Sequence, residues 1–283
     1  MTKLILAMVL VSGFMFAQDV QDTIKVICGE TQNSDYFTRI KAINALGKDI
    51  KESEFDALLA FLKKKDGSDK LPLSEVNALK NETLSALRSS HKQDHRLADE
   101  LVAMYKDKSY DQVWRDYCIQ HLGCMFQYAR PESHSEIAQL FFDATDNERG
   151  SSIAGTALIA LLNNEGQKFN KGTDQQGQES ITKENVAARA LSILNDNSAG
   201  ELAKITALQI CAKSGESKVL EHAKQILESQ ASVPLKVSAI GALGLAGSTA
   251  EKPLLEKLSL SSVSRLRIAA EAALLRLARK ESK

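Results

Sequence analysis

Three consecutive stretches decide the fold of this chain: LKVSAIGALGLAG (235–247), EKPLLEKL (251–258) and SRLRIAAEAALL (264–275). In the first and third stretches apolar residues recur four positions apart, so they lie on one face of an α-helix. Gly, Ser and Thr separate the stretches, as is typical of turns. We therefore expect three helices joined by short connections.

The same spacing recurs along most of the chain. Seven predicted first helices carry a stripe at i, i+4 and i+8, which begins at Thr38, Val76, Trp114, Ile153, Leu202, Leu235 and Leu266, in steps of 38, 38, 39, 49, 33 and 31 residues. A step near 40 is typical of a two-helix solenoid repeat. Between them lie second helices with their own apolar stripe, predicted over 54–65, 94–106, 134–144, 185–195, 218–230 and 251–260.

The three C-terminal stretches resemble HEAT repeats. Those repeats carry a basic residue beside the first apolar position, then Ala, then Leu-Gly, a turn and a Pro-Leu-Leu second helix. The basic position is matched at Arg39, Arg115, Lys236 and Arg267, and not at Asn77, Ala154 and Ala203. The resemblance implies the HEAT-repeat (armadillo-like α-solenoid) family: all-α, a right-handed α-solenoid of about six to seven helical hairpins. Together with the N-terminal pattern described next, we expect an exported, bacterial-type member.

The N-terminus predicts export. Lys3 precedes an apolar run over 4–17, and polar residues follow at once. This order is typical of a secretory signal peptide, here residues 1–17, and the run is shorter than the ~20 residues a membrane-spanning helix needs. A buried N-terminal helix is the alternative, disfavoured because the run has no polar face. We expect a periplasmic or extracellular repeat domain over 18–283, not membrane-spanning after cleavage.

Charge and composition narrow the classes of partner. The chain has 36 Lys and Arg and 36 Asp and Glu, a formal net charge of zero. Nucleic-acid-binding proteins usually show a basic excess or a basic stripe, so we expect no nucleic-acid partner. The polar stretch 164–180 (NEGQKFNKGTDQQGQES) breaks the repeat period and is predicted to be an exposed inserted loop.

The four cysteines show no metal-binding spacing. Cys118 and Cys124 lie six apart on one predicted helix, too far apart to bridge each other easily. A disulfide from Cys28 to Cys118 or Cys124 is compatible with an oxidising compartment. Free buried cysteines that act as small apolar residues are the alternative.

The best metal candidate is the pair His91 and His95, four apart on a predicted helix, with Asp94 or Asp99 nearby. No third ligand is fixed by spacing, and solvated histidines are the alternative that we favour. The aromatic stretch around Trp114 is expected to pack between repeats. Tyr110 and Tyr128, at helix ends, are better candidates for a surface role.

No catalytic motif is present. We find no Gly-x-Ser-x-Gly elbow, no phosphate loop and no dinucleotide-binding glycine pattern. Cys118 and His121 share a helix, but Cys118 occupies a core stripe position. The sequence therefore predicts no catalytic residue, no cofactor, no metal and no enzyme.

The main prediction is a scaffold or adaptor of the cell envelope that binds an unidentified protein along its second helices, which line the concave surface of a solenoid. A HEAT-like enzyme or cofactor-handling protein, lyase-like or metal-binding, is the alternative. Members of the fold family that hydroxylate with iron hold it through His-Glu dipeptides, which this sequence lacks.

Overall fold

The computed structural model describes residues 22–32, 34–65, 67–90, 94–170 and 178–281. The predicted signal peptide, residues 1–17, lies outside these ranges. The chain forms two compact units, Met1–His121 and Leu122–Lys283. The single repeat domain expected over 18–283 stays a prediction. Within the described residues, no helix combines the length and the apolar character that crossing a membrane requires.

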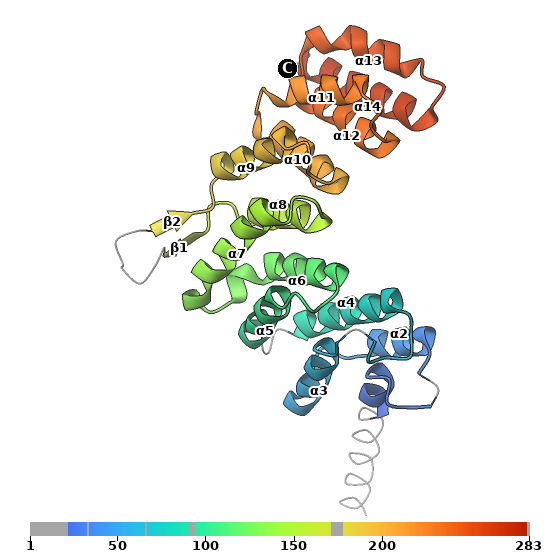
Figure 1. Ribbon diagram of the computed structural model, residues 1–283, viewed down its shortest axis with the longest axis vertical. Coiled ribbons are helices and arrows are strands. Elements are labelled where there is room, and N and C mark those ends of the chain that lie inside the picture. Colours follow the sequence, from blue (N-terminus) through green and yellow to red (C-terminus); the bar gives the residue numbers. More distant parts are fainter. Residues whose placement is uncertain (1–21, 33, 66, 91–93, 171–177, 282–283) are drawn as a thin grey trace, which may run out of the picture. The chain divides into compact units, whose positions relative to one another are not determined.

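The first unit is built from helices alone in its described part (Figure 1). A helix at 22–27 is followed by α2 (Tyr36–Asn44), α3 (Glu52–Leu62), α4 (Leu73–Ser90), α5 (Asp94–Lys106) and most of α6 (Gln112–Met125). Helices α2 and α3 both pack on α4. The core consists of large apolar side chains that are fully buried, among them Leu58, Leu62, Leu79, Leu84 and Trp114.

The second unit continues the alternation of first and second helices. After η1 (Phe126–Tyr128) and η2 (Pro131–Ser133) come α7 (His134–Asn147), α8 (Ser152–Asn163), α9 (Lys183–Asn195), α10 (Glu201–Ser214), α11 (Val219–Glu228), α12 (Val233–Ala246), η3 (Thr249–Glu251), α13 (Lys252–Ser259) and α14 (Ser264–Glu281). Each second helix packs on the first helix that follows it: α7 on α8, α9 on α10, α11 on α12 and α13 on α14. The first helices α8, α10, α12 and α14 also pack side by side.

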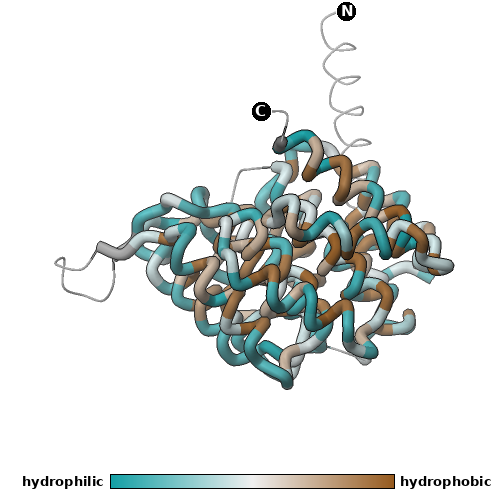
Figure 2. Tube along the Cα trace, turned by 90° about the horizontal axis from the view of Figure 1, so that it is seen from above, coloured by the Kyte–Doolittle hydropathy of each residue, from teal (hydrophilic) through white to brown (hydrophobic). Residues whose placement is uncertain are grey.

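The predicted fold class, an all-α α-solenoid of HEAT-like hairpins, is confirmed by this arrangement. Figure 2 shows why the helices pack in this way: hydrophobic and hydrophilic residues alternate along them at short intervals. One side of each helix is thereby available for burial against its neighbours. The predicted second helix at 94–106 coincides with α5, and the others differ from the observed bounds by a few residues at their ends.

The predicted stripe is correct in α4, α6, α8 and α12 but wrong by one residue in α2 and α10. In α2, Arg39 is buried and Thr38 is exposed. In α10, Ala203 and Ala207 are fully buried, whereas Leu202 is 60% exposed. The small alanines let α10 approach its neighbours closely, and this packing overrides the tendency of the larger Leu202 to be buried.

Glycines permit the close approach of first helices in the second unit. A Cβ built on Gly244 of α12 would lie 2.7 Å from the Cβ of Ala273 in α14. The same separation holds between Gly123 in α6 and Ala160 in α8. Because real Cβ contacts are longer, these helices can only pack at this distance with glycine on one side.

The inserted segment 164–180 lies between α8 and α9, and part of it differs from the loop we predicted. Strands β1 (Lys168–Asn170) and β2 (Gln178–Ser180) pair antiparallel, with Lys168 opposite Ser180. The ladder is anchored to the unit because Ile181 is fully buried and its carbonyl accepts a hydrogen bond of 2.7 Å from the Gly166 amide. Gly166 has φ +84°, a left-handed conformation that glycine adopts without strain.

Candidate functional site

The structure does not gather the predicted metal candidates into a site. His91 lies outside the described residues. His95 is exposed on α5, and Asp99 of the same helix is half-buried. In the part of the chain that the structure describes, no group of three or more His, Cys, Asp or Glu side chains is placed to hold a metal ion.

The four cysteines are free thiols, and Cys28, Cys118 and Cys211 are buried while Cys124 is exposed. Three of them therefore match the alternative given above, in which free buried cysteines act as small apolar residues. Burial raises the pKa of Cys28 to about 11 and that of Cys211 to about 12, and it also raises the pKa of Cys118. Because the thiolate is the nucleophile, these three protonated thiols are weakly reactive near neutral pH.

Of the two tyrosines predicted at the surface, Tyr128 is 49% exposed but Tyr110 is buried. The Tyr110 hydroxyl donates to the Lys63 carbonyl at 2.8 Å, which explains why a phenol at a helix end turns inward. Trp114 is fully buried, as packing between repeats requires. The prediction for Tyr110 is wrong. Its hydrogen-bond partner lies 47 residues away, so the sequence near Tyr110 does not indicate that the side chain is buried.

The basic positions of the repeats have a structural role. The Nε of Arg39 donates to the Ile27 carbonyl at 2.8 Å, and that of Arg115 donates to the Tyr105 carbonyl at 3.0 Å. Both carbonyls lie at the end of the preceding second helix, where backbone acceptors have no partner within the helix. A cation at this place satisfies them and is favoured by the helix dipole.

Two repeats depart from this structural role of the basic position. In α4, where Asn77 occupies the expected position, Lys80 one turn later is buried and its Nζ donates to the Lys64 carbonyl at 2.6 Å. Lys80 occupies a core stripe position in the sequence, and a cation there is the signal that we missed. Lys236 of α12 matches the resemblance, yet it is half-exposed and binds no helix end within the described residues.

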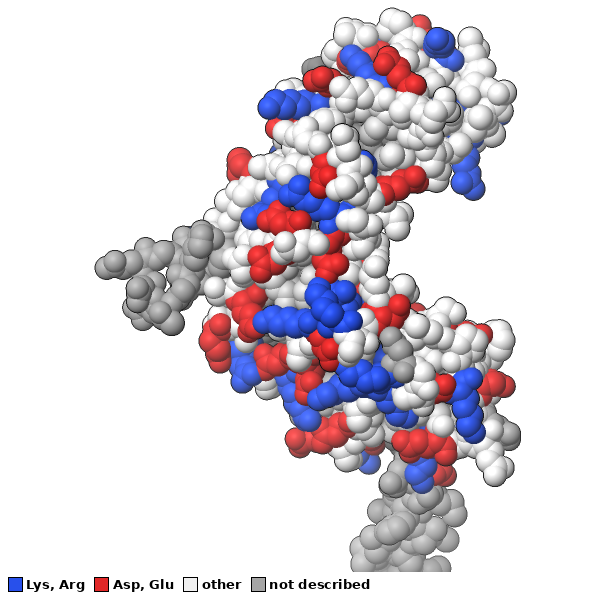
Figure 3. Space-filling view, viewed as in Figure 1, with Lys and Arg blue, Asp and Glu red and all other residues white. Residues whose placement is uncertain are grey.

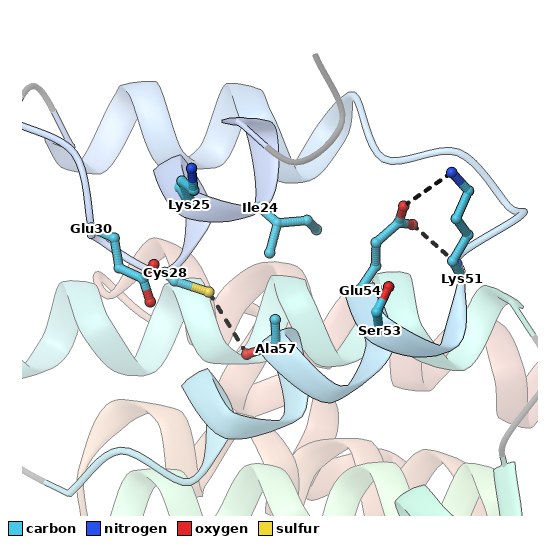
Figure 4. Close-up of a pocket in the computed structure, with 8 residues that line it drawn as sticks. All are labelled: Ile24, Lys25, Cys28, Glu30, Lys51, Ser53, Glu54 and Ala57. Carbon is cyan, nitrogen blue, oxygen red and sulfur yellow. Dashed lines mark hydrogen bonds and ion pairs between the residues drawn. The ribbon is translucent and has the colours of Figure 1, made fainter. Parts of the chain in front are cut away.

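In each unit the second helices (22–27, α3 and α5 in the first; α7, α9, α11 and α13 in the second) present a surface of their own, which we call the second-helix face of that unit. In the first unit it contains a hollow of about 350 Å³. The hollow, called the Cys28 pocket, lies between the 22–30 segment and the first turns of α3, and Figure 4 shows its lining side chains: Ile24, Lys25, Cys28, Glu30, Lys51, Ser53, Glu54 and Ala57.

The Cys28 pocket presents both signs of charge. The Glu54 carboxylate accepts a hydrogen bond of 3.0 Å from the Lys51 amide and lies 4.0 Å from the Lys51 ammonium group, so it also caps the start of α3. Lys25 and Glu30 come from the opposite wall (Figure 4). The Cys28 thiol, which points to the Ala57 carbonyl at 3.7 Å, is neutral.

A second hollow lies at the start of a second helix in the second unit. It has a volume of about 330 Å³ and lies between the first turns of α9 and the connection from α10 to α11. Ala187 and Ala188 form its floor, and Lys183, Glu184 and Glu216 again bring both signs of charge. We call it the Ala187 pocket. In each unit, therefore, the beginning of a second helix and its neighbour enclose a small hollow of mixed charge.

Ion pairs join successive second helices on this face. Between α3 and α5 the closest pairs are Asp56 with Arg96 at 2.5 Å and Lys63 with Glu100 at 2.8 Å. Arg189 of α9 pairs with Asp146 of α7, and Lys224 of α11 pairs with Glu251 at 3.0 Å. Figure 3 shows the result, with basic and acidic side chains interspersed over α5, α7 and α9. In each of these pairs a basic side chain lies beside an acidic one, so their charges offset each other locally.

One titratable side chain of the first unit is buried away from both pockets. His121 is 2% exposed, and its Nε2 donates to Asn81 Oδ1 at 3.0 Å. Its Nδ1 accepts from Arg88 at 3.4 Å. Burial, with a further contribution from the charge of Arg88, lowers the pKa of His121 to about 3. The imidazole is therefore neutral at physiological pH.

The depressed pKa of His121 predicts an acid-sensitive unit. Below the unfolded-state pKa of about 6.5, the His121 imidazole is protonated in the unfolded chain. In the folded chain it stays neutral until about pH 3. The free energy of unfolding should then fall by about 1.4 kcal/mol per pH unit over this window. Urea unfolding at pH values from about 7 to 5 measures it, and His121→Gln should flatten the slope. His95→Gln, at an exposed site, is the control; an unchanged slope in His121→Gln would contradict the prediction.

Comparisons with known proteins give a limited result. No protein-family model matches the sequence, and no curated protein matches it. A solved structure of human deoxyhypusine hydroxylase in complex with glycerol is similar to this chain, with 13% sequence identity and a TM-score of 0.40. The similarity covers 95% of this chain and 99% of that one.

The prediction that this chain is not an enzyme is corrected by that comparison. The human protein is a hydroxylase, and the similarity extends over 99% of it. The lack of a familiar catalytic motif in this sequence does not by itself exclude enzymatic activity. At this level of similarity the comparison assigns no reaction to the chain.

Proposed function

We propose that this chain is an exported helical-repeat protein of the cell envelope that binds a protein partner on its second-helix face. One observation carries the proposal: in each unit a hollow with charges of both signs lies at the start of a second helix, α3 at the Cys28 pocket and α9 at the Ala187 pocket. Recurrence at the start of two second helices is what a repeat architecture produces when one surface is used for binding.

Mixed charge favours a polypeptide over other classes of partner. A nucleic acid or an anionic membrane surface is attracted by a basic patch, whereas these pockets present Lys25 and Lys51 beside Glu30 and Glu54. Protein interfaces combine polar rims, apolar centres and complementary charges. The alanine floor of the Ala187 pocket, with Lys183 and Glu184 at its rim, has this composition.

Site-specific photo-crosslinking in the native host tests the proposal. Crosslinkers placed at Ser53 and Ala188, both exposed on the second-helix face, should capture the same partner protein. Crosslinkers at Lys236 and Glu271, on first helices, are the matched controls and should not. Capture from the first-helix positions alone would show that the proposed face is wrong.

Charge reversal then measures the contribution of the Ala187 pocket. Lys183→Glu combined with Glu184→Lys keeps the net charge and exchanges the two signs at the rim. Both side chains are exposed, so folding should be unaffected. Affinity for the captured partner should fall by about tenfold or more, as expected when complementary charges become like charges. Unchanged affinity would exclude this pocket from the interface.

Two further measurements address export and the alternative function. The signal-peptide pattern supports export, and the captured chain should come from the envelope fraction and begin at Gln18. A full-length cytoplasmic chain would refute this part of the proposal. Metal analysis of the purified protein distinguishes a HEAT-like enzyme or cofactor-handling protein, because stoichiometric iron or zinc would favour that alternative over simple partner binding.

A further inference from the structure

A second candidate surface lies on the first helices of the second unit, not on its second helices. Helices α10, α12 and α14 pack side by side, and a groove of about 400 Å³ follows α12 between its two neighbours. Gly241, Ala269 and Ala272 line it, with the apolar side chains of Val237 and Leu245 alongside. We call it the α12 groove. It shares no residue with the Cys28 or Ala187 pocket.

Gly241 is not explained by packing within the unit. A Cβ at this position would meet no atom within 4 Å, whereas a Cβ on Gly244, in the same helix, would contact Ala273 at 2.7 Å. Glycine inside a helix costs about 1 kcal/mol relative to alanine. The fold therefore requires glycine at 244 but not at 241. A glycine at 241 leaves room for a chain that approaches from outside.

Exposed apolar side chains occur in the α12 groove and elsewhere on the helices that form it. Leu245, in the groove itself, is 37% exposed. Outside the lining, Ile268 and Leu275 of α14 are 60% and 62% exposed, and Leu202 of α10 is 60% exposed. Single exposed apolar residues are ordinary, but several on three packed helices are typical of an interaction surface.

The charge of the α12 groove selects the partner. Lys213 of α10 and Arg276 of α14 are its charged lining residues, and the lining contains no acidic residue. Neither cation has an ion-pair or hydrogen-bond partner among the described residues. The helix dipole accounts for Lys213, in the last turn of α10, but Arg276 lies more than a turn before the end of α14. Unpaired cations beside an apolar floor fit a partner that brings carboxylates.

We propose that the α12 groove binds an amphipathic helix of a partner protein, with an apolar side chain seated over Gly241 and carboxylates beside Lys213 and Arg276. Grooves between packed helices accept the ridge of a third helix, and such helices bind through apolar anchors on one face. A nucleic acid would require a larger basic surface than two side chains provide. This inference does not depend on the second-helix face.

A pair of synthetic helical peptides tests the groove with the full mature chain. Both carry a leucine stripe, and one has glutamates flanking it where the other has lysines. Fluorescence anisotropy should show the acidic peptide binding at least about tenfold more tightly than the basic one, because only its carboxylates complement the two cations. Three variants follow: Gly241→Leu, which fills the groove in open space; Lys213→Glu with Arg276→Glu; and Lys236→Glu, the control on the same helix outside the lining.

The expected outcome is loss of acidic-peptide binding, by tenfold or more, in the first two variants, with binding retained in Lys236→Glu. Reversal of the preference toward the basic peptide in the double charge variant would support the assigned partner chemistry further. Circular dichroism and thermal unfolding show that each variant is folded. The proposal is overturned by equal binding of the two peptides, by no binding of either, or by binding that is insensitive to Gly241→Leu. It is also overturned if sedimentation shows a dimer that Gly241→Leu dissociates, since the groove would then bind a second copy of the chain.

Discussion

Replacing Arg39 with Met should lower the free energy of unfolding of the first unit by about 3–5 kcal/mol, the range expected when one member of a buried ion pair is removed. Arg39 is fully buried, and its guanidinium group lies 2.7 Å from Asp69 and 5.0 Å from the centre of the Phe61 ring. The substitution leaves the Asp69 carboxylate and the Ile27 carbonyl without their partner. Urea unfolding at neutral pH measures the loss.

Two controls separate the hydrogen bonds of Arg39 from its charge. Arg39→Lys keeps the cation but loses the planar fork that reaches both acceptors, so an intermediate loss is expected. Lys236→Met removes a cation from the matching sequence position of α12, where the side chain is half-exposed, and should change stability by no more than about 0.5 kcal/mol. If Arg39→Met and Lys236→Met cost the same, the structural role assigned to the buried arginine would be wrong.

The same substitution at two glycines of α12 should have opposite effects. Gly244→Ala places a Cβ 2.7 Å from the Cβ and 2.8 Å from the Cα of Ala273, so α12 and α14 must separate. Overpacking of this kind costs about 1–3 kcal/mol. Gly241→Ala adds a methyl group in open space and removes glycine from a helix interior, so it should stabilise by about 0.5–1 kcal/mol.

Thermal unfolding of the two variants side by side provides the measurement. The difference between them, about 1.5–4 kcal/mol, arises from position alone because the residues exchanged are identical. Gly247→Ala, in the turn after α12, is a poor control because a Cβ there would lie 2.3 Å from the Leu243 carbonyl. Similar melting temperatures for the Gly241 and Gly244 variants would contradict the close packing of α12 on α14.

The repeat period was enough to predict α2 to α14, but not the helix at 22–27, nor which residue of each helix faces the core. In α12, Leu235, Ala239 and Leu243 are all buried as the spacing predicts. In α10, the spacing favoured Leu202, although the helix buries Ala203 instead. Where both neighbouring positions carry apolar residues, hydrophobicity does not determine the register. The distance between packed helices determines the register. That distance depends on small residues such as Ala207, and the helix that each one faces is far away in the sequence.

The candidate sites were less predictable than the fold. The second-helix face followed from the architecture, but the Cys28 pocket joins Ile24 to Ala57, and the Ala187 pocket joins Lys183 to Glu216. Hollows of this kind depend on how the beginning of one helix meets the end of another, and a helical period carries no information about that contact. Gly244 belongs to the Leu-Gly pair of the repeat pattern and Gly241 does not, but only the surrounding atoms show that a Cβ would clash at 244 and not at 241.

The packing of each helix on helices one or two places along the chain has a kinetic consequence. Contacts between residues close in sequence form after short loop closures, and proteins rich in such contacts fold within about microseconds to milliseconds. The inserted segment between α8 and α9 changes this little, because the hydrogen bond from Gly166 to Ile181 closes its ends and each doubling of loop length costs only about 0.6 kcal/mol. We therefore expect each unit to reach its native state quickly after synthesis, because its contacts do not depend on distant parts of the chain.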